Sequence, residues 1–188
     1  MRRGFKAEAE RLSLGARSAL EQTPNSKLDP WDYAKHLDVV VLEFEELKIA
    51  DKHRRQLLEA DPDSWSGLTL KELNRYFVVV NPRHARARQC STLMHELAHI
   101  QLRHVPGQVS ISATGLMLLS DYPDDQEQEA DWLAAALLLP RDALHHYRVL
   151  GWNASQICEL YCVSLQLCEW RLRMTGVDTQ IGRTRRVG

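Results

Sequence analysis

The sequence lacks both a long apolar run and an excess of charge of either sign. No stretch approaches the roughly 18 apolar residues of a membrane-spanning helix, and the N-terminus lacks the continuous apolar run of a secretory signal. The 24 basic and 25 acidic side chains leave a net charge of −1, which excludes the strongly basic surface typical of nucleic-acid-binding proteins. We therefore expect a cytoplasmic, globular protein that does not contact membranes.

Cysteine is scarce, and its spacing excludes a zinc knuckle. The four cysteines are Cys90, Cys158, Cys162 and Cys168, and no two of them form a CxxC pair. In a cytoplasmic protein such residues are buried free thiols by default. A chain of 188 residues can bury about 70% of the surface of its unfolded state. It therefore needs neither a disulfide nor a metal ion to fold.

The apolar residues that are present predict a helix-dominated α+β fold with a small three-stranded sheet. Runs rich in β-branched residues predict strands at 39–44 and 76–82, with a short strand near Leu68 to Leu70. Residues 108–123 are predicted to form a loop with one apolar piece, ISATGLMLL.

Helical periodicity covers most of the remaining chain. Asp29 is the expected N-cap of one helix, with Pro30 at its first position. Asn153 and Ser164 are expected to cap two C-terminal helices that are joined by a tight turn near Cys162. The other helices are predicted at residues 3–21, 47–60, 86–104, 125–139 and 140–150.

One stretch, TLMHELAHIQLRH (92–104), carries three histidines and one glutamate. His95 and His99 are four residues apart, so on a helix both imidazoles lie on one face and can share a tetrahedral zinc ion. Glu96 lies beside the first ligand, where its carboxylate could take the proton of a zinc-activated water. The apolar neighbours indicate a buried helix, which argues against a surface helix that happens to carry histidines. His104 lies about 140° round the axis from His99, and we interpret it as a helix-end histidine near the C-terminal dipole.

A catalytic zinc needs a third protein ligand, and the second long helix offers candidates. The stretch DDQEQEADWLAAALLLP (124–140) contains Glu127, Glu129 and Asp131. Periodicity places Glu127 close to the apolar stripe and Glu129 on its flank. Spacing alone therefore makes Glu127 and Glu129 nearly equal candidates for the third ligand. Asp131 is either a carboxylate that accepts a hydrogen bond from a ligating imidazole or a solvated acid near the helix start.

Two further roles stay open at this point. The strand that ends in VVVNP (78–82) is either an edge that pairs with an extended substrate or a core strand without a free edge. The group that would stabilise the oxyanion is not assignable, and the histidines and tyrosine of 145–147 are candidates.

The order of motifs along the chain resembles the ImmA/IrrE family of metallo-endopeptidases. HELAH is followed by EADWLAAALLLP, and the end, LYCVSLQLCEWRLRMTG, is similar to the helix-turn-helix-like segment that closes many members. HExxH alone is moderately specific, whereas HExxH with EAD and LLLP in this order is a strong signal. The other motifs that match the family's order are GFKAEAERL, LDPWDYAKHLDVVV, WSGLTL, VVVNP and STLMHELAHI.

The resemblance implies a zincin-like metallopeptidase domain at 1–150, a helix-turn-helix-like segment packed on it at 151–176, and a flexible basic tail at 177–188. It implies that His95, His99 and Glu129 bind zinc. It implies that Glu96 is the general base that activates the water attacking the peptide carbonyl. The expected substrate is a phage-type helix-turn-helix repressor, whose cleavage would relieve repression of stress or mobile-element genes.

Two other functions compete with this one. A non-proteolytic regulator could bind a repressor by contact around a structural zinc, but such a site would not need Glu96. A DNA-binding protein could use the C-terminal helices, but the second of them offers a mixed rather than a basic set of side chains. We therefore expect a packing role and no direct DNA binding. The residues in question are Gln166, Glu169, Arg171 and Arg173.

Overall fold

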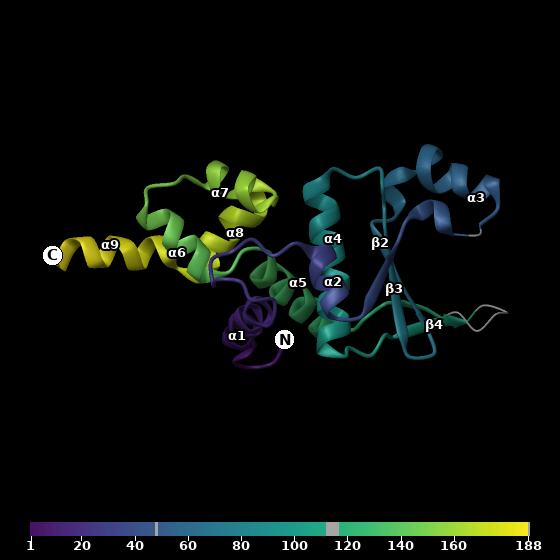
Figure 1. Ribbon diagram of the computed structural model, residues 1–188, viewed down its shortest axis with the longest axis horizontal. Helices are drawn as coiled ribbons and strands as arrows, with labels where there is room; N and C mark the ends of the chain where they lie inside the picture. The colour runs from purple at the N-terminus through teal and green to yellow at the C-terminus, as the bar shows by residue number, and fades with distance from the viewer. Residues whose placement is uncertain (48, 112–116, 188) are drawn as a thin grey trace.

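The C-terminal helices and the sheet lie at opposite ends of an elongated molecule in the computed structural model, which describes residues 1–47, 49–111 and 117–187 (Figure 1). Helix α4 (Arg86–Leu102) stands between the two ends and packs against α5 (Asp124–Leu138). The predicted helix-rich α+β class is confirmed. Within the described ranges, no helix is both long and apolar enough to cross a membrane.

The helices begin at the predicted caps. The side chain of Asp29 accepts hydrogen bonds from the backbone of Trp31 and Asp32, and Asn153 and Ser164 cap the two C-terminal helices as expected. The remaining helices are α1 (Phe5–Ala19), α2 (Pro30–His36), η1 (Phe44–Glu46), α3 (Asp51–Arg55), η2 (Gln56–Ala60), η3 (Pro62–Ser64), α6 (Arg141–Val149), α7 (Ala154–Tyr161), α8 (Leu165–Thr175) and α9 (Val177–Val187).

The sheet contains five described strands, so the expectation of three was wrong. The predicted strands are β1 (Val39–Leu42), β2 (Gly67–Glu72) and β3 (Arg75–Val80). Two more strands, β4 (Gln108–Ile111) and β5 (Met117–Ser120), form a pair in the region predicted as a loop. The order is β1-β3-β2-β5-β4, with β1 parallel to β3 and the other pairs antiparallel.

The additional strands depend on distant partners. All four residues of β4 are exposed, so β4 carries no buried face that a periodicity argument could detect. β5 pairs with β2, which lies far earlier in the chain. The middle of the apolar piece ISATGLMLL, residues 112–116, lies outside the described residues.

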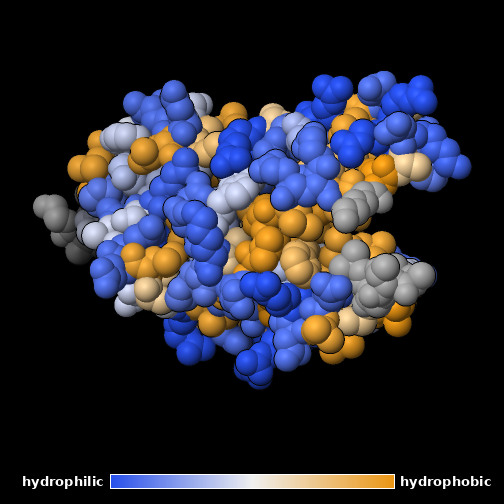
Figure 2. Space-filling view, turned by 45° about the vertical axis from the view of Figure 1, so that its right-hand side comes forward, coloured by the Kyte–Doolittle hydropathy of each residue, from blue (hydrophilic) through white to orange (hydrophobic). Residues whose placement is uncertain are grey.

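Two apolar cores flank the sheet. The larger core joins one face of β1 and β3 to α1, α4, α5 and the C-terminal helices, and it includes Val78, Leu93 and Leu133. The smaller core, around Phe44 and Val79, lies on the opposite face beneath α3 and η2. Figure 2 shows apolar residues in the hollow between the two projections at the right of the view. Helix α4, which carries His95, Glu96 and His99, packs on the face of the sheet that the larger core covers.

The C-terminal end of α5 is buried, and side chains of other helices satisfy its carbonyl groups. Ser13 Oγ donates to Ala136 O at 2.7 Å, and a guanidinium nitrogen of the fully buried Arg17 donates to Leu137 O at 2.7 Å. Arg171 Nε donates to the carbonyl oxygen of Leu139 at 2.9 Å. Both cations also lie at the negative end of the helix dipole. Burial lowers the pKa of Arg17 to about 10, so its side chain remains charged at neutral pH.

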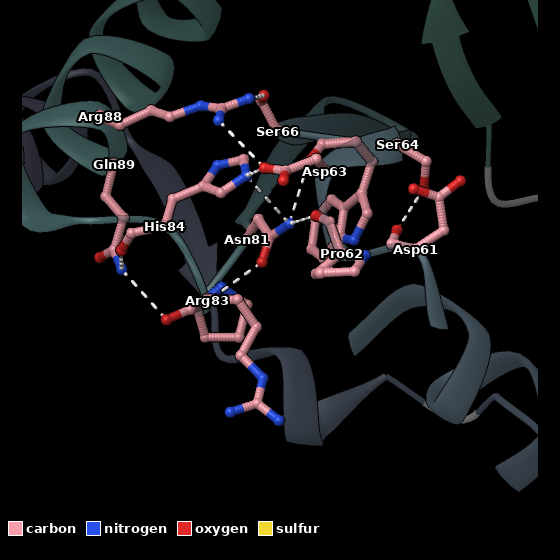
Figure 3. A network of polar contacts seen from close by, with 12 residues as sticks. Asp61, Pro62, Asp63, Ser64, Ser66, Asn81, Arg83, His84, Arg88 and Gln89 are labelled. Carbon is pink, nitrogen blue, oxygen red and sulfur yellow. Dashed lines mark hydrogen bonds and ion pairs between the residues drawn. The ribbon is translucent and has the colours of Figure 1, made fainter. Parts of the chain in front are cut away.

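A second polar network fixes the loop that leads into β2 (Figure 3). The amide of the buried Asn81 donates to Pro62 O at 2.6 Å and to Trp65 O at 2.9 Å, and its oxygen accepts from the backbone of Arg83. Asp63 lies 3.4 Å from His84 Nε2, just before the start of α4. The beginning of β2 and the beginning of α4 are therefore held by one set of hydrogen bonds.

The C-terminal region consists of helices that are joined by short turns. The tight turn expected near Cys162 is present between α7 and α8. The tail expected to be flexible instead forms α9, which packs against α6 through the buried Val177 and an ion pair of 2.7 Å between Arg148 and Asp178. The amphipathic pattern of α9 gives this segment an apolar side to bury.

We predict that Arg17→Met lowers the free energy of unfolding by about 3 kcal/mol or more. Each buried acceptor left without a donor costs about 1–3 kcal/mol, and Arg17 serves the carbonyls of Ser26 and Leu137. Urea denaturation of both forms measures this difference. Arg11→Met, the same change at an exposed position of α1, is the control and should have little effect.

Candidate metal centre

Two histidines of α4 face α5 from consecutive turns. The rings of His95 and His99 have centroids 4.7 Å apart, and their Nε2 atoms are separated by 3.0 Å. The helix presents them in this way because Leu93, Met94, Leu97 and Ala98 fill its buried sides. The expected pairing of the two imidazoles is therefore present.

Glu127 of α5 completes a group of three. Its carboxylate oxygens lie 3.2 Å from His95 Nε2 and 3.6 Å from His99 Nε2, and all the ligand atoms lie within 4.8 Å of one another. Bonds of about 2.0–2.1 Å to a tetrahedral zinc-type ion would separate such atoms by roughly 3.3 Å. The three residues fit a metal ion of this kind without rearrangement.

Glu129, which the resemblance implies as the third ligand, lies elsewhere. Its buried carboxylate accepts hydrogen bonds from the backbone nitrogen of Arg2 at 2.7 Å and from Arg2 Nε at 3.0 Å. Among the described residues, the structure brings Glu127 and not Glu129 to the two imidazoles. The reason is helical geometry, since two residues along a helix correspond to a rotation of about 200°.

Asp131 contacts the first histidine from the side opposite the metal position. Its Oδ1 lies 2.9 Å from His95 Nδ1, which fits the first of the two roles considered for this acid. An ionised carboxylate only accepts hydrogen bonds, so this contact places a proton on Nδ1 and leaves the lone pair of Nε2 free for a metal.

The electrostatics of the two rings differ. Burial, together with the neighbouring His95 and His104, lowers the pKa of His99 to about 3, so this ring is neutral at neutral pH. Burial also lowers the pKa of His95, but the hydrogen bond to Asp131 and the nearby acids outweigh it and raise the pKa above its usual value. Burial likewise raises the pKa of Glu127. The surroundings of His95 thus favour positive charge, which a bound cation would supply.

Glu96 points into a cavity of about 410 Å³ beside the metal position. Its carboxylate accepts a hydrogen bond from Thr69 Oγ1, a buried group on β2. Gly67 of the same strand permits this close approach, because a Cβ atom there would lie 2.6 Å from Thr92 Cγ2. The expected base, the two expected histidine ligands and an open cavity therefore lie together.

The strand beside this cavity is β2 rather than the strand that ends in VVVNP. β3 lies between β1 and β2, so it is a core strand without a free edge. β2 pairs with β5 only from Thr69 onwards, whereas Gly67 and Leu68 pair with β3 alone among the described residues. The outer backbone edge at Gly67 therefore borders the cavity, and no pattern in the sequence indicates this edge.

Two other residues differ from expectation. Tyr122 stacks on His99, with ring centroids 3.8 Å apart and an interplanar angle of 29°, and sequence analysis did not single it out. Tyr147, one of the oxyanion candidates, packs against Trp152 and Tyr161 in the C-terminal helices. Residues 145–147 are absent from the described lining of the cavity.

One comparison with known proteins identifies the family of the chain. A search of curated proteins found no match. The family model Peptidase_M78, described as an IrrE N-terminal-like domain, matches residues 34–173, which span every strand and the whole metal group. The chain therefore belongs to the ImmA/IrrE family of metallopeptidases.

Proposed function

We propose that this protein is a zinc-dependent endopeptidase that cleaves a helix-turn-helix transcriptional repressor of the phage type and so relieves repression. The observation that carries the proposal is the convergence of His95, His99 and Glu127 beside Glu96 and an open cavity. Two imidazoles and one carboxylate are the donor set of many catalytic zinc sites, which keep a further position open.

The chain's own residues account for the rest of the reaction. A zinc ion held by His95, His99 and Glu127 would lower the pKa of a water molecule and would polarise the peptide carbonyl. Glu96 takes the proton of the attacking water and passes it to the departing amine. Thr69 holds Glu96 in position by its hydrogen bond. The free backbone edge at Gly67 pairs with an extended substrate and brings its peptide bond to the cavity.

The proposed substrate rests on family membership, because the cavity lining alone does not specify a protein partner. The alternative, a regulator that binds a repressor by contact around a structural zinc, gives no role to Glu96 or to the Thr69 hydrogen bond. Direct DNA binding by α8 is disfavoured, because Arg171 is fully buried and donates to Leu139 O and Glu10. Trp170 of the same helix packs edge-on against Trp132.

We predict that Glu127→Ala removes zinc from the protein. Wild type dialysed against zinc should hold about one ion per chain, because the described residues contain one group of three ligands. Elemental mass spectrometry measures this ratio. Gln128→Ala, an exposed neighbour on α5, is the control and should keep its zinc. Loss of zinc from Glu129→Ala at saturating zinc, with retention in Glu127→Ala, would reassign the third ligand.

We predict that Glu96→Gln keeps zinc but slows cleavage by about 10²- to 10⁴-fold, the usual contribution of a general base. The assay incubates the zinc-loaded protein with a phage-type repressor encoded beside its gene and identifies fragments by mass spectrometry. Casein serves as a test of unspecific proteolysis. Full cleavage by Glu96→Gln would exclude the mechanism, and repressor binding without cleavage by wild type would favour the contact regulator.

We predict that Thr69→Val lowers the rate of cleavage by about ten- to a hundredfold, since hydrogen bonds to charged groups contribute about 1.5–3 kcal/mol. Valine keeps the shape of threonine, so zinc content should not change. Thr179→Val, at an exposed position of α9, is the control. A Thr69→Val protein with the wild-type rate would show that Glu96 does not depend on this contact.

A further inference from the structure

His104 lies against His99 because the chain reverses at the end of α4. Arg103 adopts a left-handed conformation (φ 54°), and the backbone nitrogen of His104 donates to His99 O at 3.0 Å. The Nδ1 atoms of the two rings are then 3.0 Å apart, and the rings meet at 73°. His104, which we interpreted as a helix-end histidine, therefore contacts His99, one of the proposed metal ligands.

The other side of His104 faces Glu129. His104 Nε2 is buried and has no hydrogen-bond partner among the described residues. It lies 3.8 Å from Glu129 Oε2, somewhat beyond hydrogen-bond length. Glu129 is in turn held by the backbone and side chain of Arg2. A buried polar atom without a partner calls for an explanation. The His104 ring lies between His99 and Glu129, so it could link these two residues.

Metal binding by His99 would determine which ring nitrogens of His99 and His104 carry protons. A neutral imidazole that gives its Nε2 lone pair to a metal carries its proton on Nδ1. That proton is then donated to His104 Nδ1. His104, as a neutral ring, must carry its own proton on Nε2, where it points toward the ionised Glu129. The proton of His99 then meets an acceptor on His104 at 3.0 Å, and the proton of His104 is directed toward the negative charge of Glu129 at 3.8 Å.

We propose that His104 and Glu129 are positioning residues that hold His99 in the orientation and tautomer that bind zinc. The inference rests on the proposed zinc site. It gives His99 the support that Asp131 gives His95 directly, at 2.9 Å. It also gives a role to Glu129, a buried acid of α5 whose Oε2 lies 3.8 Å from His104 Nε2.

The test measures the zinc dissociation constant by competition with a chromophoric chelator. His104→Ala and Glu129→Ala should each weaken zinc binding by about 10- to 100-fold, as loss of such supporting groups does elsewhere. His104→Asn should recover part of the loss, because its Oδ1 occupies the position of Nδ1 and can accept from His99. In the double variant the two losses should not add, because both residues act through one ring.

A second readout separates positioning from a general loss of structure. With Co²⁺ in place of zinc, His104→Ala should change the visible absorption spectrum of the metal, since the His99 ring is free to rotate. His53→Ala removes an exposed histidine of α3, which contributes nothing to the metal group, and should leave the dissociation constant and the spectrum unchanged. Thermal unfolding confirms that each variant is folded.

The outcomes distinguish this inference from the proposed function. Wild type that binds zinc tightly, with His104→Ala and Glu129→Ala binding equally well, would overturn the role of His104 and Glu129 alone. Wild type that binds no zinc would overturn the zinc site and this inference with it. Weaker binding in both variants, with partial recovery in His104→Asn, is the expected result.

Discussion

The burial of α5 is the constraint on which the rest of the structure depends. After Ala130 this helix is apolar on nearly every side, so it must be enclosed. Enclosure removes water from the carbonyl groups at its C-terminal end, where Pro140 provides no backbone N–H. Arg17 and Arg171 occupy that end, and this requirement fixes α1 and α8 around α5. The opposite, N-terminal end of α5 is then free to carry the acids that face α4.

The sequence was sufficient for most helices and for the pairing of His95 and His99 on α4. Caps at Asp29, Asn153 and Ser164, and the paired histidines of HELAH, are local signals that need no distant partner. The β4–β5 pair could not be predicted in this way, because its exposed edge strand gains order only by pairing with β5 and, through it, with β2. The free edge at Gly67 is a property of the assembled sheet for the same reason.

The third ligand shows both the value and the limit of resemblance. A matching motif pointed to Glu129, whereas Glu127 and Asp131 are spaced by four residues, the same interval as His95 and His99. Two pairs at one helical interval can face each other across two packed helices, and this is the arrangement found. That comparison of intervals was available in the sequence. The contact of His104 with His99 could not be predicted from the sequence. It depends on the left-handed backbone conformation of Arg103, which helical periodicity does not reveal.

The enclosure of one helix end by two arginines also bears on the order of folding. Arg17 and Leu137 are 120 positions apart, and Arg171 reaches Leu139 from 32 positions further along the chain. Contacts of such long range slow folding, since loop closure costs entropy before they form. On the ribosome, α5 has no complete set of partners until α8 has been synthesised. Until then the apolar surface of α5 is only partly covered by the segments that precede it.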